Sequence, residues 1–156
     1  MCQVKSLLLL VLALGTSACS SRDTFAILNN AKTPLTLTYT FKPRLDNISL
    51  SEQLHLIATV ASDKAGEVDC SWASLSPTQY SYDQEMRKVS VQIPQATAVR
   101  IAKLSNYRET SEWAADQFPI AAITIEGAQG IIRFEEGQAR KQFKNLKRSL
   151  HAVDYR

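Results

Sequence analysis

The stretch TPLTLTYTF, residues 33–41, alternates apolar and polar side chains from position 35 onward. Successive side chains of a β-strand point to opposite faces of the sheet, so a period of two predicts a strand with one buried face. Threonines occupy the other face, and the positions expected to be buried are Leu35, Leu37, Tyr39 and Phe41. This segment indicates a fold built from half-buried β-strands.

The same period of two recurs along the chain, with turn-forming residues between the repeats. The segment TFAILNN, residues 24–30, ends in two asparagines, and together with Pro34 it predicts a hairpin over residues 25–41. Two apolar arms around residues 126–130 predict a second hairpin within IAAITIEGAQGIIRF, residues 120–134. Further strands are predicted in LHLIATVAS (residues 54–62), VSVQIP (residues 89–94) and TAVRIAKL (residues 97–104).

Six or more short strands separated by turns are typical of all-β folds. We therefore expect a mainly β protein, either an antiparallel β-sandwich or a small barrel, with one or two short helical segments. The segment ETSEWAADQF, residues 109–118, predicts one or two helical turns with Thr110 or Ser111 as the N-cap. Weak periodicity over residues 62–85 predicts a long connection with at most one short strand.

The C-terminal segment fits two periodicities. Apolar residues at positions 139, 143, 146, 150 and 153 fall on one helical stripe. Residues 149–155, however, alternate as a strand would. We expect a helical turn or irregular segment over residues 139–148, followed by a closing strand over residues 149–155.

Length and composition are those of one globular domain. The chain has 156 residues, of which 45% are apolar and 21% are charged. Its formal net charge of +3 neither requires nor excludes an anionic partner, and no nucleic-acid partner is predicted. No apolar run reaches the ~20 residues of a transmembrane helix.

The N-terminus has the three-part layout of a secretory signal. One positive charge, Lys5, precedes a continuously apolar run over residues 7–14, and the small residues GTSA lead to Cys19. This stretch resembles the lipobox of bacterial lipoproteins, although Thr16 stands where that class prefers leucine. The resemblance implies that the signal peptide is cleaved between Ala18 and Cys19, and that the Cys19 thiol carries the lipid.

The resemblance divides the chain into a signal peptide (residues 1–18), a short lipid-anchored tether (residues 19–24) and a single β-rich domain (residues 25–156). Each buried methylene contributes ~0.8 kcal/mol, so several acyl chains hold such a protein on the membrane almost permanently. In Gram-negative members aspartate after the cysteine favours the inner membrane, so Ser20 implies the outer membrane, with the domain facing the periplasm. The alternative is an ordinary secretory signal cut near Ala18, which would leave a soluble protein.

Once the signal peptide is removed and Cys19 carries lipid, Cys70 is the one cysteine left. A single remaining thiol is either a reactive group or a buried one. Asp69 and Glu67 lie close to Cys70 in the sequence, and their negative charges oppose thiolate formation. We therefore expect an inert thiol packed beside Trp72.

The other titratable residues show no catalytic or metal-binding spacing. His55 and His151 are the two histidines, and neither belongs to a metal-ligating pattern. The sequence has no nucleotide-binding glycine loop and no serine-hydrolase motif, so no cofactor is predicted. Pairs of neighbouring acids would serve a glycosidase only if the fold placed them across a cleft. These pairs are Glu67/Asp69, Asp83/Glu85, Glu109/Glu112 and Glu135/Glu136.

Two sets of residues remain as candidate binding surfaces. Residues 138–156 contain six basic groups and one acid, Asp154, and would face anionic headgroups near a membrane or simply stay solvated. Aromatic residues in or beside expected loops would bind a sugar or a partner protein, or fill the core. These aromatic residues are Tyr80, Tyr82, Tyr107, Trp113 and Phe118.

We therefore expect a membrane-anchored envelope lipoprotein whose β-rich domain binds or scaffolds rather than catalyses. It would act as an accessory component of a cell-envelope complex, with an envelope protein or polysaccharide as its partner. The alternative is a periplasmic enzyme that uses converging carboxylates or Cys70. That alternative requires two facing acids, or an exposed Cys70 near a histidine.

Overall fold

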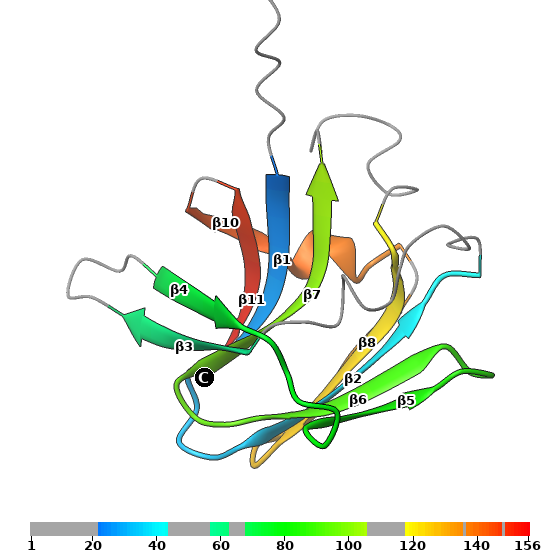
Figure 1. Cartoon of the computed structure of the whole chain (residues 1–156), viewed down its shortest axis with the longest axis horizontal. Helices are drawn as coiled ribbons and strands as arrows, with labels where there is room; N and C mark the ends of the chain where they lie inside the picture. The colour runs from blue at the N-terminus through cyan, green and yellow to red at the C-terminus, as the bar shows by residue number, and fades with distance from the viewer. Residues whose placement is uncertain (1–21, 44–56, 63–67, 106–117, 136, 148) are drawn as a thin grey trace, which may run out of the picture.

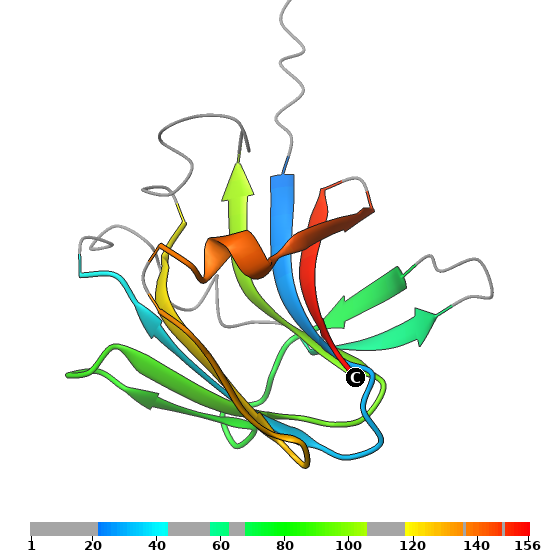
Figure 2. The ribbon, with the colours of Figure 1, turned by 180° about the vertical axis from the view of Figure 1, so that it is seen from behind.

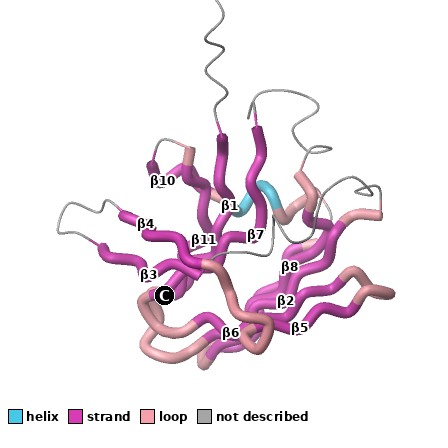
Figure 3. The backbone as a smooth tube through the Cα atoms, viewed as in Figure 1, coloured by secondary structure: helices cyan, strands magenta, loops and turns pink. Residues whose placement is uncertain are grey.

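The computed structural model describes residues 22–43, 57–62, 68–105, 118–135, 137–147 and 149–156. These residues form two β-sheets and one short 3₁₀ helix, η1 (Arg140–Gln142) (Figures 1 and 3). The six-stranded sheet has the order β10 (Lys144–Lys147), β11 (Leu150–Tyr155), β1 (Arg22–Asn29), β7 (Thr97–Ser105), β3 (Ile57–Ser62) and β4 (Val68–Ala73). The five-stranded sheet has the order β5 (Tyr80–Asp83), β6 (Lys88–Ile93), β2 (Leu35–Phe41), β8 (Ile120–Gly127) and β9 (Gly130–Phe134).

The two sheets pack against each other as a sandwich, which confirms one of the two predicted architectures. All paired strands run antiparallel except β1 and β11, which are parallel. Parallel neighbours need a long connection. Here the connection from β1 to β11 includes every strand of the five-stranded sheet. The first and last described strands nevertheless lie side by side (Figure 2).

Strand β2 lies in the middle of the five-stranded sheet, as its alternation predicts. Its burial alternates residue by residue, with Leu35, Leu37 and Tyr39 fully buried and the threonines half-buried. β6 and β8 flank it on either side in continuous or nearly continuous register. A cross-strand contact of 3.1 Å between the hydroxyls of Thr38 and Ser90 supports the β2–β6 pair on the outer face.

The predicted hairpin over residues 25–41 is wrong, because β1 and β2 belong to different sheets. Asn29 explains the difference. Its buried side-chain amide donates hydrogen bonds to the carbonyls of Thr33 and Ile93, each at 2.9 Å, and its Oδ1 accepts one from the backbone of Ala31. These bonds direct the chain from one layer of the sandwich to the other instead of closing a hairpin within one sheet.

The second predicted hairpin is confirmed. β8 and β9 pair antiparallel around a two-residue turn, with Gly127 opposite Gly130. The strands predicted from residues 54–62, 89–94 and 97–104 correspond to β3, β6 and β7.

Two other segments differ from expectation. Residues 62–85 contain two strands, β4 and β5, where at most one was expected, because antiparallel partners order sequence that has little periodicity of its own. In the tail, the helical turn is η1 and the closing strand is β11, but β10 occupies part of the segment expected to be irregular. The helical turns predicted over residues 109–118 lie almost entirely outside the described residues.

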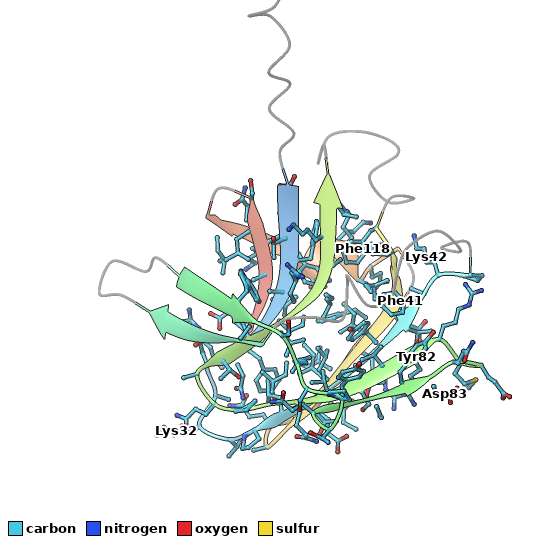
Figure 4. The ribbon with its side chains drawn as sticks, viewed as in Figure 1. Lys32, Phe41, Lys42, Tyr82, Asp83 and Phe118 are labelled. Atoms are coloured by element: carbon cyan, nitrogen blue, oxygen red, sulfur yellow. The ribbon has the colours of Figure 1, made fainter. Side chains whose placement is uncertain are left out.

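The core lies between the sheets and consists of aliphatic and aromatic side chains from both. Phe118 points into this space, where its ring lies 5.0 Å from Phe25 and 5.6 Å from Phe143 (Figure 4). In the part of the chain that the structure describes, no helix is both long and apolar enough to span a bilayer.

Candidate functional site

A buried acid–histidine pair links β1 and β11 at the end of the sandwich where β1 begins. The parallel register places Phe25 opposite His151. Asp23 precedes Phe25 by two positions, so strand alternation puts Asp23, Phe25 and His151 on the same, core-facing side. Both polar residues thus enter the core because they occupy inward positions of half-buried strands.

The geometry of the pair is close and enclosed. His151 Nε2 lies 3.1 Å from Oδ1 of Asp23, and the two residues are 5% and 9% exposed. The imidazole also stacks on the ring of Phe25, with centroids 4.8 Å apart and planes inclined by 12°. Phe143 meets the same Phe25 ring edge-on at 5.6 Å. A buried polar group must keep a partner to offset its desolvation, and the pair satisfies that need.

Such a pair can orient an imidazole and fix which nitrogen carries its proton. A catalytic role would require substrate to reach the imidazole, but the histidine is buried and stacks on the ring of Phe25. Neither of the two surface hollows described below includes Asp23 or His151. The arrangement therefore fits a structural cross-link between the first and last strands better than a catalytic centre.

A second buried polar residue, Arg100, lies on the opposite face of the six-stranded sheet. Its guanidinium carbon lies 6.0 Å from the centre of the Trp72 ring, and burial lowers the pKa of Arg100. Trp72 also packs against a small buried cluster made of Leu28, Ala98 and Ala152. Trp72 therefore covers part of the outer face of the six-stranded sheet.

Among the residues that the structure describes, two surface hollows can be delineated. One, of about 320 Å³, lies between the β1–β2 loop, the β8–β9 turn and Tyr155. The other, of about 500 Å³, runs along β10 and β11 and is lined by residues of both strands together with Gln142 and Arg156. We call this second hollow the β10–β11 groove. Its lining residues are Gln142, Lys144, Leu146, Ala152, Val153, Asp154 and Arg156.

The two sheets differ in how their edges are protected. Edge strands usually carry lysines, prolines or bulges that prevent pairing with another chain. β10 follows this rule, with two lysines and an irregular register. β9 does not, because its register is continuous and it exposes Ile131 and Ile132 by 55% and 40%. These two isoleucines form an apolar edge on the five-stranded sheet.

The sequence-predicted site residues fall mostly outside what the structure describes. Cys19 and Ala18 lie outside the described residues, as does His55. Cys70 is placed on β4 opposite Val60, but its side chain is not among those described. The prediction that it is an inert, buried thiol therefore stays a prediction.

The paired acids and aromatic residues are placed only in part. Asp83, Glu85 and Glu135 are exposed, whereas the other paired acids have no described side chain. Phe118 fills the core, and Tyr80 and Tyr82 pack against it half-buried, which confirms core packing for these three aromatics. Tyr107 and Trp113 lie outside the described residues. Among the residues the structure describes, no group of three or more potential metal ligands comes together.

Sequence reasoning missed the Asp23–His151 pair, although a signal for it exists. Asp23 shares its strand face with Phe25 and Ile27, and His151 shares its own with Val153. A polar residue in phase with a buried stripe indicates a buried partner, but the sequence alone does not say that these two strands are neighbours.

Comparison with known proteins adds no family to this description. The chain matches no protein-family model, no curated protein and no solved structure. Its function must therefore be inferred from its own residues and their arrangement.

Proposed function

We propose that this chain is a lipid-anchored protein of the bacterial cell envelope, held by Cys19, whose β-sandwich is a binding or scaffolding module. The observation that carries the proposal is the small-residue run before Cys19, which follows an apolar signal segment too short to span a bilayer. The module would face the periplasm from the outer membrane, as an accessory component of an envelope complex.

The start of β1 supports an anchor close to the folded domain. β1 begins at Arg22, so residues 22–24, which the sequence assigns to the tether, belong to the strand. Arg22 follows Cys19 by three positions, a span of at most ~10 Å. In the six-stranded sheet, Arg22 pairs with Ser105, so the start of β1 and the end of β7 form one end of the sandwich (Figure 1). We call this the anchor end.

A binding role is supported by the surface rather than by an enclosed cleft. The apolar edge of β9 exposes Ile131 and Ile132 where an uncomplexed strand is usually charged. Such an edge suits a protein partner that contributes a strand or an apolar patch. For the enzyme alternative, the described members of the acid pairs are exposed, and the Cys70 side chain is not among those described.

The direct test is the intact mass of the protein purified from the membrane fraction, compared with a Cys19→Ala variant. The wild type is expected to lack residues 1–18 and to carry acyl groups, while Cys19→Ala carries none. A Cys70→Ala variant is the matched control, since it also removes one thiol but should remain acylated. An unacylated wild-type protein in the soluble fraction would overturn the proposal.

A further inference from the structure

The β10–β11 groove combines positive charge, hydrogen-bonding groups and an apolar floor. Buried Ala152 lies on the floor, half-buried Val153 borders the groove from a position that faces the core, and Leu146 is an exposed apolar wall. Gln142 and Lys144 are exposed on the β10 side. A volume of about 500 Å³ lies within the ~300–1,000 Å³ range of small-ligand sites.

The far end of the groove holds a positioned guanidinium. Arg156 Nε donates a hydrogen bond of 2.8 Å to Oδ2 of Asp154. The other oxygen of Asp154 accepts a 2.7 Å hydrogen bond from Nδ2 of Asn30. Because Asn30 and Arg156 occupy both carboxylate oxygens, Asp154 acts as a support that orients Arg156. The Arg156 bond uses Nε, which leaves the two terminal nitrogens of the guanidinium to meet an outside acceptor.

The two cations of the groove are well separated along the strands. Lys144 pairs with Ala152, and Arg156 lies four positions farther along the chain, or ~13 Å at the rise of a β-strand. A polymer with repeated acidic groups matches cations spaced in this way, and its hydroxyls would suit Gln142 while its apolar ring faces suit Leu146.

One end of the groove lies away from the anchor end. β11 runs parallel to β1, and Asn30 donates its backbone N–H to Tyr155 at 2.8 Å. Arg156 therefore lies at the end of the sandwich opposite the anchor end (Figure 2). The eight residues of β1 separate these ends by ~26 Å.

We propose that the β10–β11 groove binds peptidoglycan, an anionic polymer of the cell envelope, with Lys144 and Arg156 contacting carboxylates of its peptide side chains and Asp154 positioning Arg156. This inference rests on the proposed function, which places the module on the periplasmic side of the membrane. It adds the class of ligand that the module binds. An anionic bilayer is the competing source of negative charge, but to contact Arg156 it would have to reach the end opposite the anchor.

The test is co-sedimentation of the mature protein, in detergent, with purified peptidoglycan sacculi as the probe. Wild type is expected to sediment with sacculi, and to do so less after their carboxylates are blocked as amides. Lys144→Ala and Arg156→Ala should each weaken binding about fivefold, the loss expected for one charged hydrogen bond worth ~1 kcal/mol. Lys141→Ala is the matched control, because Lys141 is an exposed cation of η1 that does not line the groove.

Asp154→Asn separates positioned binding from simple charge attraction. This variant removes a negative charge, so non-specific attraction would strengthen binding, whereas loss of the support for Arg156 should weaken it. Equal urea midpoints for all variants would show that the fold is intact.

The groove proposal is overturned if Lys144→Ala and Arg156→Ala bind sacculi as tightly as wild type does. It is equally overturned if Lys141→Ala loses as much binding as the groove variants, or if Asp154→Asn binds sacculi more tightly than wild type. It is also overturned if the groove variants lose binding to anionic vesicles but not to sacculi. The sedimentation assay does not depend on the lipid. Loss of the groove proposal in this assay and loss of the proposed function in the intact-mass measurement of Cys19 acylation are therefore separate outcomes.

Discussion

His151 Nε2 and Asp23 Oδ1 lie 3.1 Å apart although 128 residues separate them in the chain. The contact joins the first and last described strands through side chains, in addition to the backbone pairing of β1 with β11. Both residues are buried, so the contact between them helps to offset the loss of water. The pair therefore fastens the C-terminal strand to the anchor end of the sandwich.

Asp23→Ala should lower the free energy of unfolding by about 1–3 kcal/mol, the cost of leaving one buried hydrogen-bonding partner behind. Asp23→Asn keeps an acceptor at the same place and should lose less. Urea unfolding followed by circular dichroism measures both. Glu85→Ala is the control, since Glu85 is exposed and its loss should change stability by less than ~0.5 kcal/mol. If Asp23→Ala matched this control, the pair would contribute nothing to stability.

Because the Tyr39 phenol is buried, we expect the protein to lose stability at alkaline pH. Burial, and secondarily the neighbouring Tyr80, raises the pKa of the Tyr39 phenol well above its ordinary value. Above ~pH 10 the folded chain keeps a proton that the unfolded chain releases. The contribution of Tyr39 to the free energy of unfolding is therefore complete below ~pH 10 and declines above it by ~1.4 kcal/mol per pH unit. Urea unfolding between about pH 8 and about pH 11 should show this decline in the wild type.

Tyr39→Phe isolates that contribution, because phenylalanine keeps the ring and has no proton to release. The difference in unfolding free energy between the two proteins should change steeply above ~pH 10 and stay flat below it. Parallel pH profiles would mean that Tyr39 titrates alike in the folded and unfolded chains.

The strands themselves could be predicted from the sequence, because alternation is a local signal. Leu35, Leu37 and Tyr39 are buried as their spacing predicts, and the glycines at 127 and 130 flank the predicted turn. Each of these features depends on a few neighbouring residues. Local patterning therefore sufficed for the strands and for one hairpin.

Strand partners could not be predicted in the same way. The transfer of the chain between sheets depends on the bonds from Asn29 to Thr33 and Ile93, and Ile93 is 64 residues away. The parallel pairing of β1 with β11, and with it the Asp23–His151 contact, joins opposite ends of the described chain. Nothing local in either strand specifies its neighbour, so these features appear only once the chain is folded.

The apolar edge of β9 should limit solubility when no partner covers it. Ile131→Lys places a charge on the free edge and should raise the protein concentration at which light scattering begins. Ile131 is exposed, so the free energy of unfolding should change by less than ~0.5 kcal/mol. Gln129→Lys adds the same charge on the exposed β8–β9 turn. If both variants gained solubility equally, net charge and not the edge would be the cause.

Position 127 requires glycine because a side chain there would have no room, and not because of its backbone conformation. A Cβ atom at this position would lie 2.6 Å from Cδ2 of Leu35 and 2.7 Å from the hydroxyl of Tyr155, both buried. Gly127→Ala should therefore destabilise the fold by about 1–3 kcal/mol through overpacking, whereas Ala128→Ser on the exposed turn should not. Tyr155→Phe removes one of the clashing atoms. The double variant, Gly127→Ala with Tyr155→Phe, should accordingly be more stable than the sum of the two single losses predicts. Strict additivity of the two losses in urea unfolding would show that the hydroxyl takes no part in the clash.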